Sequence, residues 1–91
     1  MKISPIEVET ALNSHADVID SVAVGVEDET YGEVVKAFVI KKDDSKLTER
    51  ELIKYVLKKL ANFKVPRYIY YITEFPRNNI GKIDRKALKN M

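Results

Sequence analysis

A lysine follows a glycine in the polar segment of residues 77–85, near the end of the chain. Glycine adopts backbone dihedral angles that other residues avoid, so Gly81 favours a flexible loop or the close approach of a ligand. The ammonium group of Lys82 is a mobile point charge with three hydrogen-bond donors and no acceptor. This chemistry suits a side chain that reaches into an anionic site elsewhere. Taken alone, however, the two residues favour a solvated surface lysine, one of 12 in the chain.

A short helix is predicted directly after this loop, over residues 85–90, because Asp84 is of the type that caps helix N-termini. This end of the chain is basic. Residues 62–91 contain seven Lys and Arg but two Asp and Glu, whereas the whole chain has a net charge of +2. Such a distribution favours an anionic partner: a nucleotide, a phosphate or a nucleic acid. A solvated basic helix without any partner would have the same composition.

The composition is that of one small soluble domain. Its 91 residues are 45% hydrophobic and 33% charged, which is ordinary for a globular domain with a core but little room for a deep pocket. The absence of cysteine excludes a disulfide framework and a thiolate site, and with His15 as the only histidine no transition-metal site is expected. No apolar run approaches the ~20 residues of a membrane span, and there is no signal-peptide pattern, so we expect a cytoplasmic location.

The acidic residues between positions 27 and 33 raise the alternative of a site for a hard cation. Their spacing lacks the regular series of ligands found in a calcium loop. We therefore expect a solvated turn here and no metal site in the chain.

Two helices are predicted from capping patterns at their first turns. In Ser4-Pro5-Ile6-Glu7 the serine and the glutamate form a capping box, and the proline occupies the first helical position. Thr48 and Glu51 repeat the capping box before a second helix. Each box is flanked by an apolar pair with the spacing of a hydrophobic staple, Ile3 with Val8 and Leu47 with Leu52. The buried stripe of the second helix is predicted to contain Leu52, Ile53, Val56, Leu57 and Leu60.

Three strands are predicted, over residues 21–26, 33–41 and 67–73, from alternating or continuous apolar residues. A short turn joins the first two, which we therefore expect to pair antiparallel. A helix precedes the third strand, and we expect a right-handed crossover that places this strand beside the first. The sequence thus predicts a small two-layer α+β domain: a three-stranded, mainly antiparallel sheet, two capped helices on one face and a short C-terminal helix.

Together these segments resemble the C-terminal domain of the adenylate-forming enzymes, which include the AMP-forming acyl-CoA synthetases. The similarity covers nearly all 91 residues, and the motifs follow the family's order and spacing. Residues 31–37 and 63–67 look more like acyl-CoA synthetases than like the adenylation domains of peptide synthetases. The resemblance is carried by Ile3-Ser4-Pro5-Ile6-Glu7-Val8-Glu9, Val24-Gly25-Val26, Asp28, Gly32-Glu33-Val34-Val35-Lys36-Ala37-Phe38-Val39, Phe63-Lys64-Val65-Pro66-Arg67, Phe75-Pro76-Arg77 and Gly81-Lys82-Ile83-Asp84-Arg85-Lys86-Ala87-Leu88.

The resemblance implies that residues 1–91 are the mobile lid of a ligase whose large N-terminal domain binds ATP, Mg²⁺ and a carboxylic acid. By position, Lys82 is then the catalytic lysine of the adenylation step, and Gly81, Asp84 and Arg85 form its supporting loop. A positive charge there stabilises the phosphoryl oxygens as a carboxylate attacks the α-phosphate. The lid then rotates, withdraws the lysine and offers another face for thioester formation with CoA.

The resemblance also implies what this chain lacks. In the family, the hinge and the glycine-rich segment on which the lid pivots lie before Met1, and ATP and the acyl group are bound mainly in the other domain. The isolated chain is therefore expected to be inactive. An arginine that meets CoA in some members corresponds here to Leu57, beside Lys58 and Lys59, so no CoA-binding residue is assigned.

Two other functions remain open from the sequence. An adenylation domain that loads a carrier protein would form its thioester on phosphopantetheine and not on free CoA. A nucleic-acid-binding module would use the basic end, with Tyr68, Tyr70 and Tyr71 as a stacking platform. Such tyrosines more often pack on a sheet face, so no nucleic-acid partner is expected. The expected partners are the N-terminal domain of the same enzyme, the acyl-adenylate and CoA.

Overall fold

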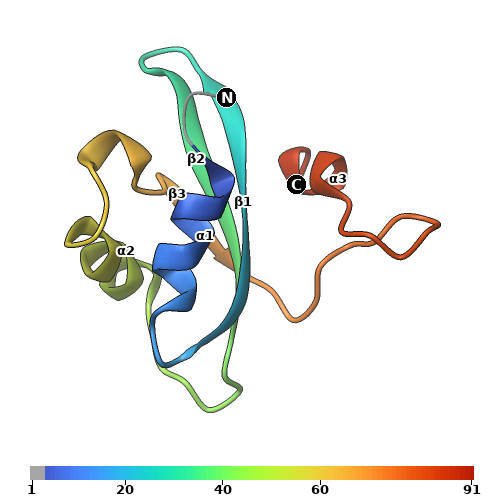
Figure 1. Ribbon diagram of the computed structural model, residues 1–91, viewed down its shortest axis with the longest axis horizontal. Coiled ribbons are helices and arrows are strands. Elements are labelled where there is room, and N and C mark those ends of the chain that lie inside the picture. The colour runs from blue at the N-terminus through green and yellow to red at the C-terminus, as the bar shows by residue number, and fades with distance from the viewer. Residues whose placement is uncertain (1–3) are drawn as a thin grey trace.

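The computed structural model describes residues 4–91, which form a three-stranded sheet with helices on both faces (Figure 1). The elements follow in the order α1 (Pro5–Asn13), β1 (Val18–Asp28), β2 (Gly32–Lys41), α2 (Glu49–Leu57), the 3-10 turn η1 (Asn62–Lys64), β3 (Tyr68–Tyr71) and α3 (Arg85–Lys89). The predicted α+β class is therefore confirmed. The predicted staple between Ile3 and Val8 lies partly outside the described residues.

The position of β3 corrects one prediction. The strand order is β1-β2-β3, so β3 lies beside β2 and not beside β1. β1 and β2 pair antiparallel over their length, as predicted, whereas β3 pairs parallel with β2, from Tyr68 opposite Lys36 to Tyr71 opposite Val39. The crossover rule relates strands that run parallel, and the strand that enters the crossover is β2. The sheet is consequently mixed, with a long antiparallel and a short parallel ladder.

The acidic segment between β1 and β2 is a turn, as its spacing predicted. The carboxylate of Asp28 accepts hydrogen bonds from the backbone N–H groups of Thr30 and Tyr31, at 3.0 and 2.9 Å. Gly32 ends the turn with φ +81°, in the left-handed region that favours glycine. The side chain of Asp28 therefore closes the turn through its bonds to the backbone of the next residues.

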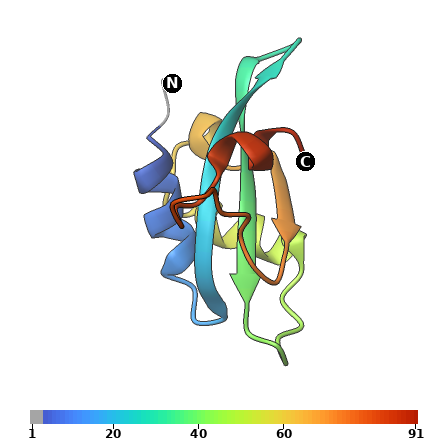
Figure 2. The same cartoon turned by 90° about the vertical axis from the view of Figure 1, so that its right-hand side faces the viewer.

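Each face of the sheet has its own hydrophobic core. Both α1 and α2 cover one face, as predicted, while α3 and the chain before it cover the other (Figures 1 and 2). Small side chains, Ala23 and Ala37, line the first face where α1 approaches β1. The fully buried residues of the first core include Val8, Leu12, Val39, Leu52 and Val56, and the second core contains Val22, Val24, Phe38, Phe75 and Leu88.

The two predicted capping boxes differ in the structure. Before α2, the Thr48 hydroxyl accepts from the N–H of Glu51 at 3.1 Å, and the Glu51 carboxylate accepts from the N–H of Thr48 at 3.0 Å. The hydrogen bond from the Thr48 N–H to the carboxylate holds the pKa of Glu51 below its usual range. Before α1, Ser4 accepts from the N–H of Glu7 at 3.4 Å, but the Glu7 carboxylate pairs with Lys64 at 2.9 Å. Only one half of the first box is therefore formed.

The end of α2 also differs from the prediction. The helix stops at Leu57, so Leu60 lies beyond it, although Leu60 is still buried in the first core. Leu57 was expected on the buried stripe but is 44% exposed. Across residues 4–91, no helix has the length and apolar character needed to cross a membrane.

Candidate functional site

The predicted loop around Lys82 is a hydrogen-bonded β-hairpin that extends away from the sheet (right-hand side of Figure 1). Its two arms meet at an antiparallel bridge between Arg77 and Ile83. Closer to the tip, the N–H of Asn78 donates to the carbonyl of Lys82 at 2.8 Å. These paired backbone groups define the path of the hairpin, where the sequence had predicted only a flexible loop.

Asn78 organises the turn at the tip. Its side-chain oxygen accepts from the N–H groups of Ile80 and Lys82, at 3.0 and 3.1 Å, and its carbonyl accepts from the N–H of Gly81 at 3.0 Å. Gly81 has φ +83°, which favours glycine, and its carbonyl accepts from Nη1 of Arg77 at 2.9 Å. Of the two uses expected for Gly81, the structure thus shows the unusual backbone dihedral angle. Asn78 was not singled out from the sequence, although asparagine commonly bonds the backbone two residues ahead in turns.

The side chain of Lys82 is exposed on this hairpin. Within residues 4–91, the ion pairs closer than 4.0 Å join Lys64 to Glu7 and Arg85 to Glu9. The ammonium group of Lys82 therefore has no carboxylate partner in the described part of the domain. It is available to an anionic group that approaches from outside.

The base of the hairpin is fixed to α3. The N–H of Asp84 donates to the carbonyl of Pro76 at 2.8 Å, which closes the hairpin one step below its bridge. The Asp84 carboxylate accepts from the N–H of Ala87 at 3.0 Å and so caps α3, as predicted. Leu88, on the same helix, is fully buried in the second core together with Phe75. The hairpin is therefore attached to the sheet through α3 after its second arm and through Phe75 before its first arm.

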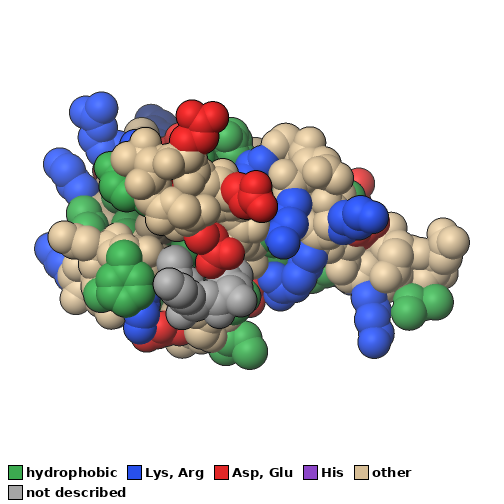
Figure 3. All heavy atoms as spheres, turned by 90° about the horizontal axis from the view of Figure 1, so that it is seen from above, with side chains coloured by type: hydrophobic (Ala, Val, Ile, Leu, Met, Phe, Trp, Pro, Cys, Tyr) green, Lys and Arg blue, Asp and Glu red, His purple; other side chains and the backbone are tan. Residues whose placement is uncertain are grey.

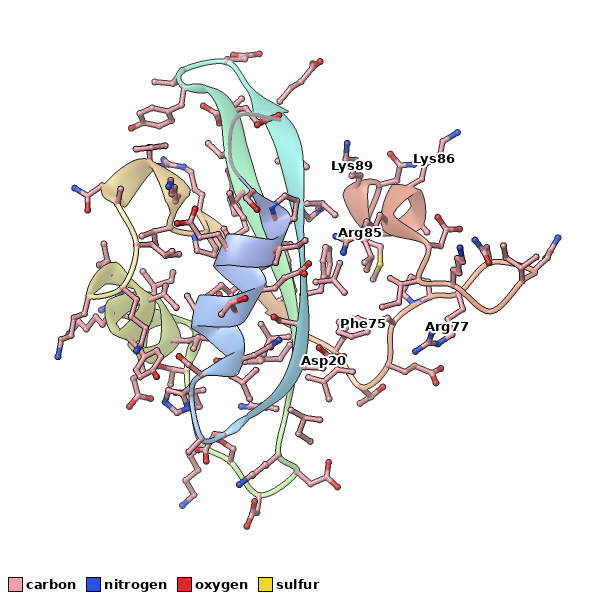
Figure 4. All side chains as sticks on the ribbon, in the orientation of Figure 1. Asp20, Phe75, Arg77, Arg85, Lys86 and Lys89 are labelled. Atoms are coloured by element: carbon pink, nitrogen blue, oxygen red, sulfur yellow. The ribbon has the colours of Figure 1, made fainter. Side chains whose placement is uncertain are left out.

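Arg85 points toward the sheet and not toward the tip of the hairpin (Figure 4). Its Nη1 donates to the carbonyl of Ala23 on β1 at 2.9 Å and lies 3.2 Å from Oε2 of Glu9 on α1. The same carboxylate oxygen accepts from the N–H of Ala23 at 2.8 Å. The structure thus separates Arg85 from Lys82 and brings it together with Glu9, which the sequence did not identify as a site residue.

A second feature is an open hollow of about 650 Å³ beside the turn between β1 and β2. Its walls include Tyr31, Leu57, Phe63 and Arg67. Tyr31 and Phe63 are 62% and 66% exposed, and the Arg67 guanidinium lies 4.9 Å from the centre of the Tyr31 ring. Exposed aromatic rings beside a cation suit a ligand with a planar ring and an anionic group.

Charge is unevenly spread over the surface. Basic side chains gather over α3 and the hairpin, as the composition predicted (Figure 3). On α3, Lys86 points away from the sheet, whereas Lys89 points upward from the side of the helix nearer the sheet (Figure 4). In the part of the chain that the structure describes, His, Asp and Glu side chains form no group of three that could hold a metal ion.

The tyrosines of β3 divide between the two faces of the sheet. The rings of Tyr68 and Tyr70 stack with centroids 6.5 Å apart, and Tyr70 stacks on Phe38 at 5.6 Å. Tyr71 instead joins the first core, and its hydroxyl donates to the carbonyl of Thr48 at 3.0 Å. These rings pack on the sheet, which is the commoner of the two roles considered for them.

The chain matches the family model of the AMP-binding enzyme C-terminal domain over residues 7–82. It is 40% identical over 87 residues to the oxalate–CoA ligase of Saccharomyces cerevisiae, covering 96% of this chain and 16% of that protein. It is 40% identical over 89 residues to the 2-succinylbenzoate–CoA ligase of Bacillus cytotoxicus, covering 98% of this chain and 18% of that protein. Among solved structures, apo MatB from Rhodopseudomonas palustris superimposes with a TM-score of 0.90 at 27% identity, over 97% of this chain and 18% of that one.

The chain spans less than a fifth of the length of each of these relatives. The family match extends from α1 to Lys82 in the hairpin, and the fold agrees closely with that of a solved structure. The resemblance inferred from the sequence motifs is therefore confirmed, and the chain belongs to the family of AMP-binding enzyme C-terminal domains.

Proposed function

We propose that this domain is the mobile lid of an ATP-dependent, AMP-forming acid–CoA ligase, and that Lys82 supplies the positive charge for the adenylation half-reaction. The observation that carries the proposal is the exposed lysine on a hydrogen-bonded hairpin, without a carboxylate partner in the described part of its own domain. Family membership supports the reaction class, since the relatives named above are CoA ligases.

The chemistry of adenylation explains why a lysine is needed. A carboxylate attacks the α-phosphate of ATP, so two anions approach one another while negative charge develops on the phosphoryl oxygens. An ammonium group held between them lowers the energy of this charge and orients the attack. Lys82 acts in this scheme as a protonated electrostatic catalyst and not as a base. ATP, Mg²⁺ and the acid would be bound mainly by a separate, larger domain of the same enzyme.

The second half-reaction would use another surface of the same domain. After adenylation the lid would rotate, withdraw Lys82 and present the hollow beside Tyr31 to CoA. The exposed ring of Phe63 offers a stacking surface for the adenine of CoA, and Arg67 offers a charge for its phosphates. The two surfaces belong to different hairpins of the domain, which supports a rotation between the half-reactions.

The test is Lys82→Ala in the full-length ligase. Acid-dependent exchange between ATP and pyrophosphate should fall by about 10²–10³-fold, as when one transition-state contact is lost. Transfer of the acyl group from preformed acyl-adenylate to CoA should change little, because Lys82 is withdrawn in that step. Exchange at the wild-type rate would contradict the assignment of Lys82.

The acceptor is tested separately. A ligase of free CoA should form acyl-CoA without any carrier protein. An adenylation domain for a carrier protein should acylate the phosphopantetheine of that protein and leave free CoA unchanged. Assays of the full-length enzyme with both acceptors distinguish the two functions.

A further inference from the structure

A side-chain contact joins three elements that lie far apart in the sequence. Glu9 on α1 and Arg85 on α3 are 76 residues apart, and they meet at Ala23 on β1. The Glu9 carboxylate accepts from the N–H of Ala23 at 2.8 Å, while Arg85 donates to the carbonyl of Ala23 at 2.9 Å. The side chain of Glu9 is 15% exposed and that of Arg85 is 48% exposed. We call this contact the Glu9–Arg85 clamp.

The clamp holds the element that carries the hairpin. α3 has five residues, which is too short for a helix to be stable without tertiary contacts. The contacts that join it to the sheet include the buried side chain of Leu88 and Arg85 at its first position, and directly after its end Lys36 of β2 donates to the backbone oxygen of Met91. An apolar contact alone leaves a short helix free to rotate, whereas directional hydrogen bonds at its first position and directly after its end fix its orientation, and Arg85 is the one next to the hairpin. The clamp therefore sets the angle at which the hairpin leaves the sheet.

Lys82 lies three residues before this anchor. The intervening residues are themselves constrained, because Ile83 is bridged to Arg77 and the N–H of Asp84 is bonded to Pro76. A rotation of α3 would consequently move the hairpin as one piece and displace the ammonium group. A displacement of about 1 Å can reduce a reaction rate by about 10²-fold when catalysis depends on position.

We propose that Arg85 and Glu9 are positioning residues for Lys82, through the orientation of α3 and the hairpin. This inference rests on the proposed function of Lys82 and adds two residues that do not touch the reacting groups. It predicts a selective loss, since only the adenylation step needs Lys82 at a defined place. Thioester formation, which uses a different surface, should not depend on the clamp.

The experiment measures both half-reactions in the full-length enzyme carrying Arg85→Ala, Arg85→Lys or Glu9→Gln. Arg85→Ala should lower the kcat of adenylation by about 10- to 10²-fold, with acyl transfer from preformed acyl-adenylate to CoA within twofold of wild type. Arg85→Lys keeps a positive charge and hydrogen-bond donors but lacks the planar guanidinium group. It should therefore adenylate faster than Arg85→Ala but more slowly than wild type. Glu9→Gln keeps an acceptor for Ala23 but removes the charge, and it should show a smaller loss in the same step. Lys86→Ala, on the side of α3 that faces away from the sheet, is the matched control and should leave both steps unchanged.

A double variant separates positioning from a general structural role. If Arg85 acts through Lys82, then Arg85→Ala combined with Lys82→Ala should adenylate no more slowly than Lys82→Ala alone. An additive loss, or an equal loss in both half-reactions, would overturn the positioning role. If Lys82→Ala alone had no effect, the proposed function itself would fail. If Lys82→Ala were impaired but Arg85→Ala adenylated normally, only the positioning role of Arg85 would fail.

Discussion

The guanidinium group of Arg67 lies 4.9 Å from the centre of the Tyr31 ring and thereby connects the turn between β1 and β2 to the start of β3. A contact of this kind at an exposed site contributes about 0.5–1 kcal/mol. It forms one wall of the hollow that also contains Phe63. The wall is therefore built from two distant segments, and it belongs to the hollow that we propose for CoA.

Replacement of Phe63 by alanine should weaken CoA binding. The ring is 66% exposed and contributes little to the core, so its loss should mainly remove a stacking surface. Stacking of one base on an aromatic ring contributes about 1–3 kcal/mol, which corresponds to a KM for CoA at least about fivefold higher. The rate of ATP–pyrophosphate exchange should not change. Ile19→Ala is the control, because Ile19 is also large and 61% exposed but does not line the hollow; equal effects of both variants would contradict the assignment.

Two glycines allow a matched comparison of the two hairpins. Gly32 and Gly81 have φ +81° and +83°, and a Cβ atom at either position would meet nothing within 4 Å. Alanine at each should therefore impose the same backbone strain, about 1–2 kcal/mol, without a steric clash. We expect Gly81→Ala to slow adenylation and Gly32→Ala to slow thioester formation, each by about tenfold or less. Measurement of both half-reactions for both variants checks this, and an identical pattern for the two would contradict it.

The two helix caps should differ in their contribution to stability. Thr48→Ala removes the hydroxyl acceptor of a complete capping box and should lower the free energy of unfolding by about 1 kcal/mol, or Tm by about 4–8 °C. Ser4→Ala removes a single, longer bond of 3.4 Å and should cost less. Thermal unfolding of the 91-residue chain measures both changes. Thr48→Ser is the control and should unfold near the wild-type temperature.

Ionisation of Tyr71 should be visible at high pH. Burial, with a further contribution from Glu49 and Glu51, raises the pKa of Tyr71 from 10.0 to about 12. A pKa that is higher in the folded state means that the full stability is present below pH 10 and is lost as the pH rises toward 12. In a titration of tyrosinate absorbance, Tyr71→Phe should remove a component near pH 12 from the five tyrosines of the wild type. Loss of a component near pH 10 instead would contradict this.

Local features of this domain were predictable from the sequence, and contacts between distant segments were not. The caps at Thr48 and Asp84 follow from residue types within one turn of a helix, and both form as expected. The β1–β2 hairpin has two edges at which β3 could pair, and the predicted pairing of β3 with β1 was wrong. The exposure of Leu57 was also not predicted. The periodic pattern of apolar residues continues to Leu60 and does not show that the helix ends at Leu57.

The candidate site shows the same division. Gly81 and Lys82 were found through the family motif, and Asn78 has a recognisable turn chemistry. Glu9 could not be found in this way, since its carboxylate meets Arg85 only after the sheet has brought α1 and α3 to the same edge. A single sequence contains no signal for a contact across 76 positions.

The contact at Ala23 has one more consequence, for the behaviour of the domain in solution. Among residues 4–91, β1 is an edge strand, because the strand order is β1-β2-β3 and only β2 lies beside it. An edge strand with free N–H and C=O groups is a template for pairing with another chain. At Ala23 both groups are already bonded, one by a carboxylate and the other by a guanidinium. The Glu9–Arg85 clamp thus occupies, at the middle of this edge, the two backbone groups that an added strand would need for pairing.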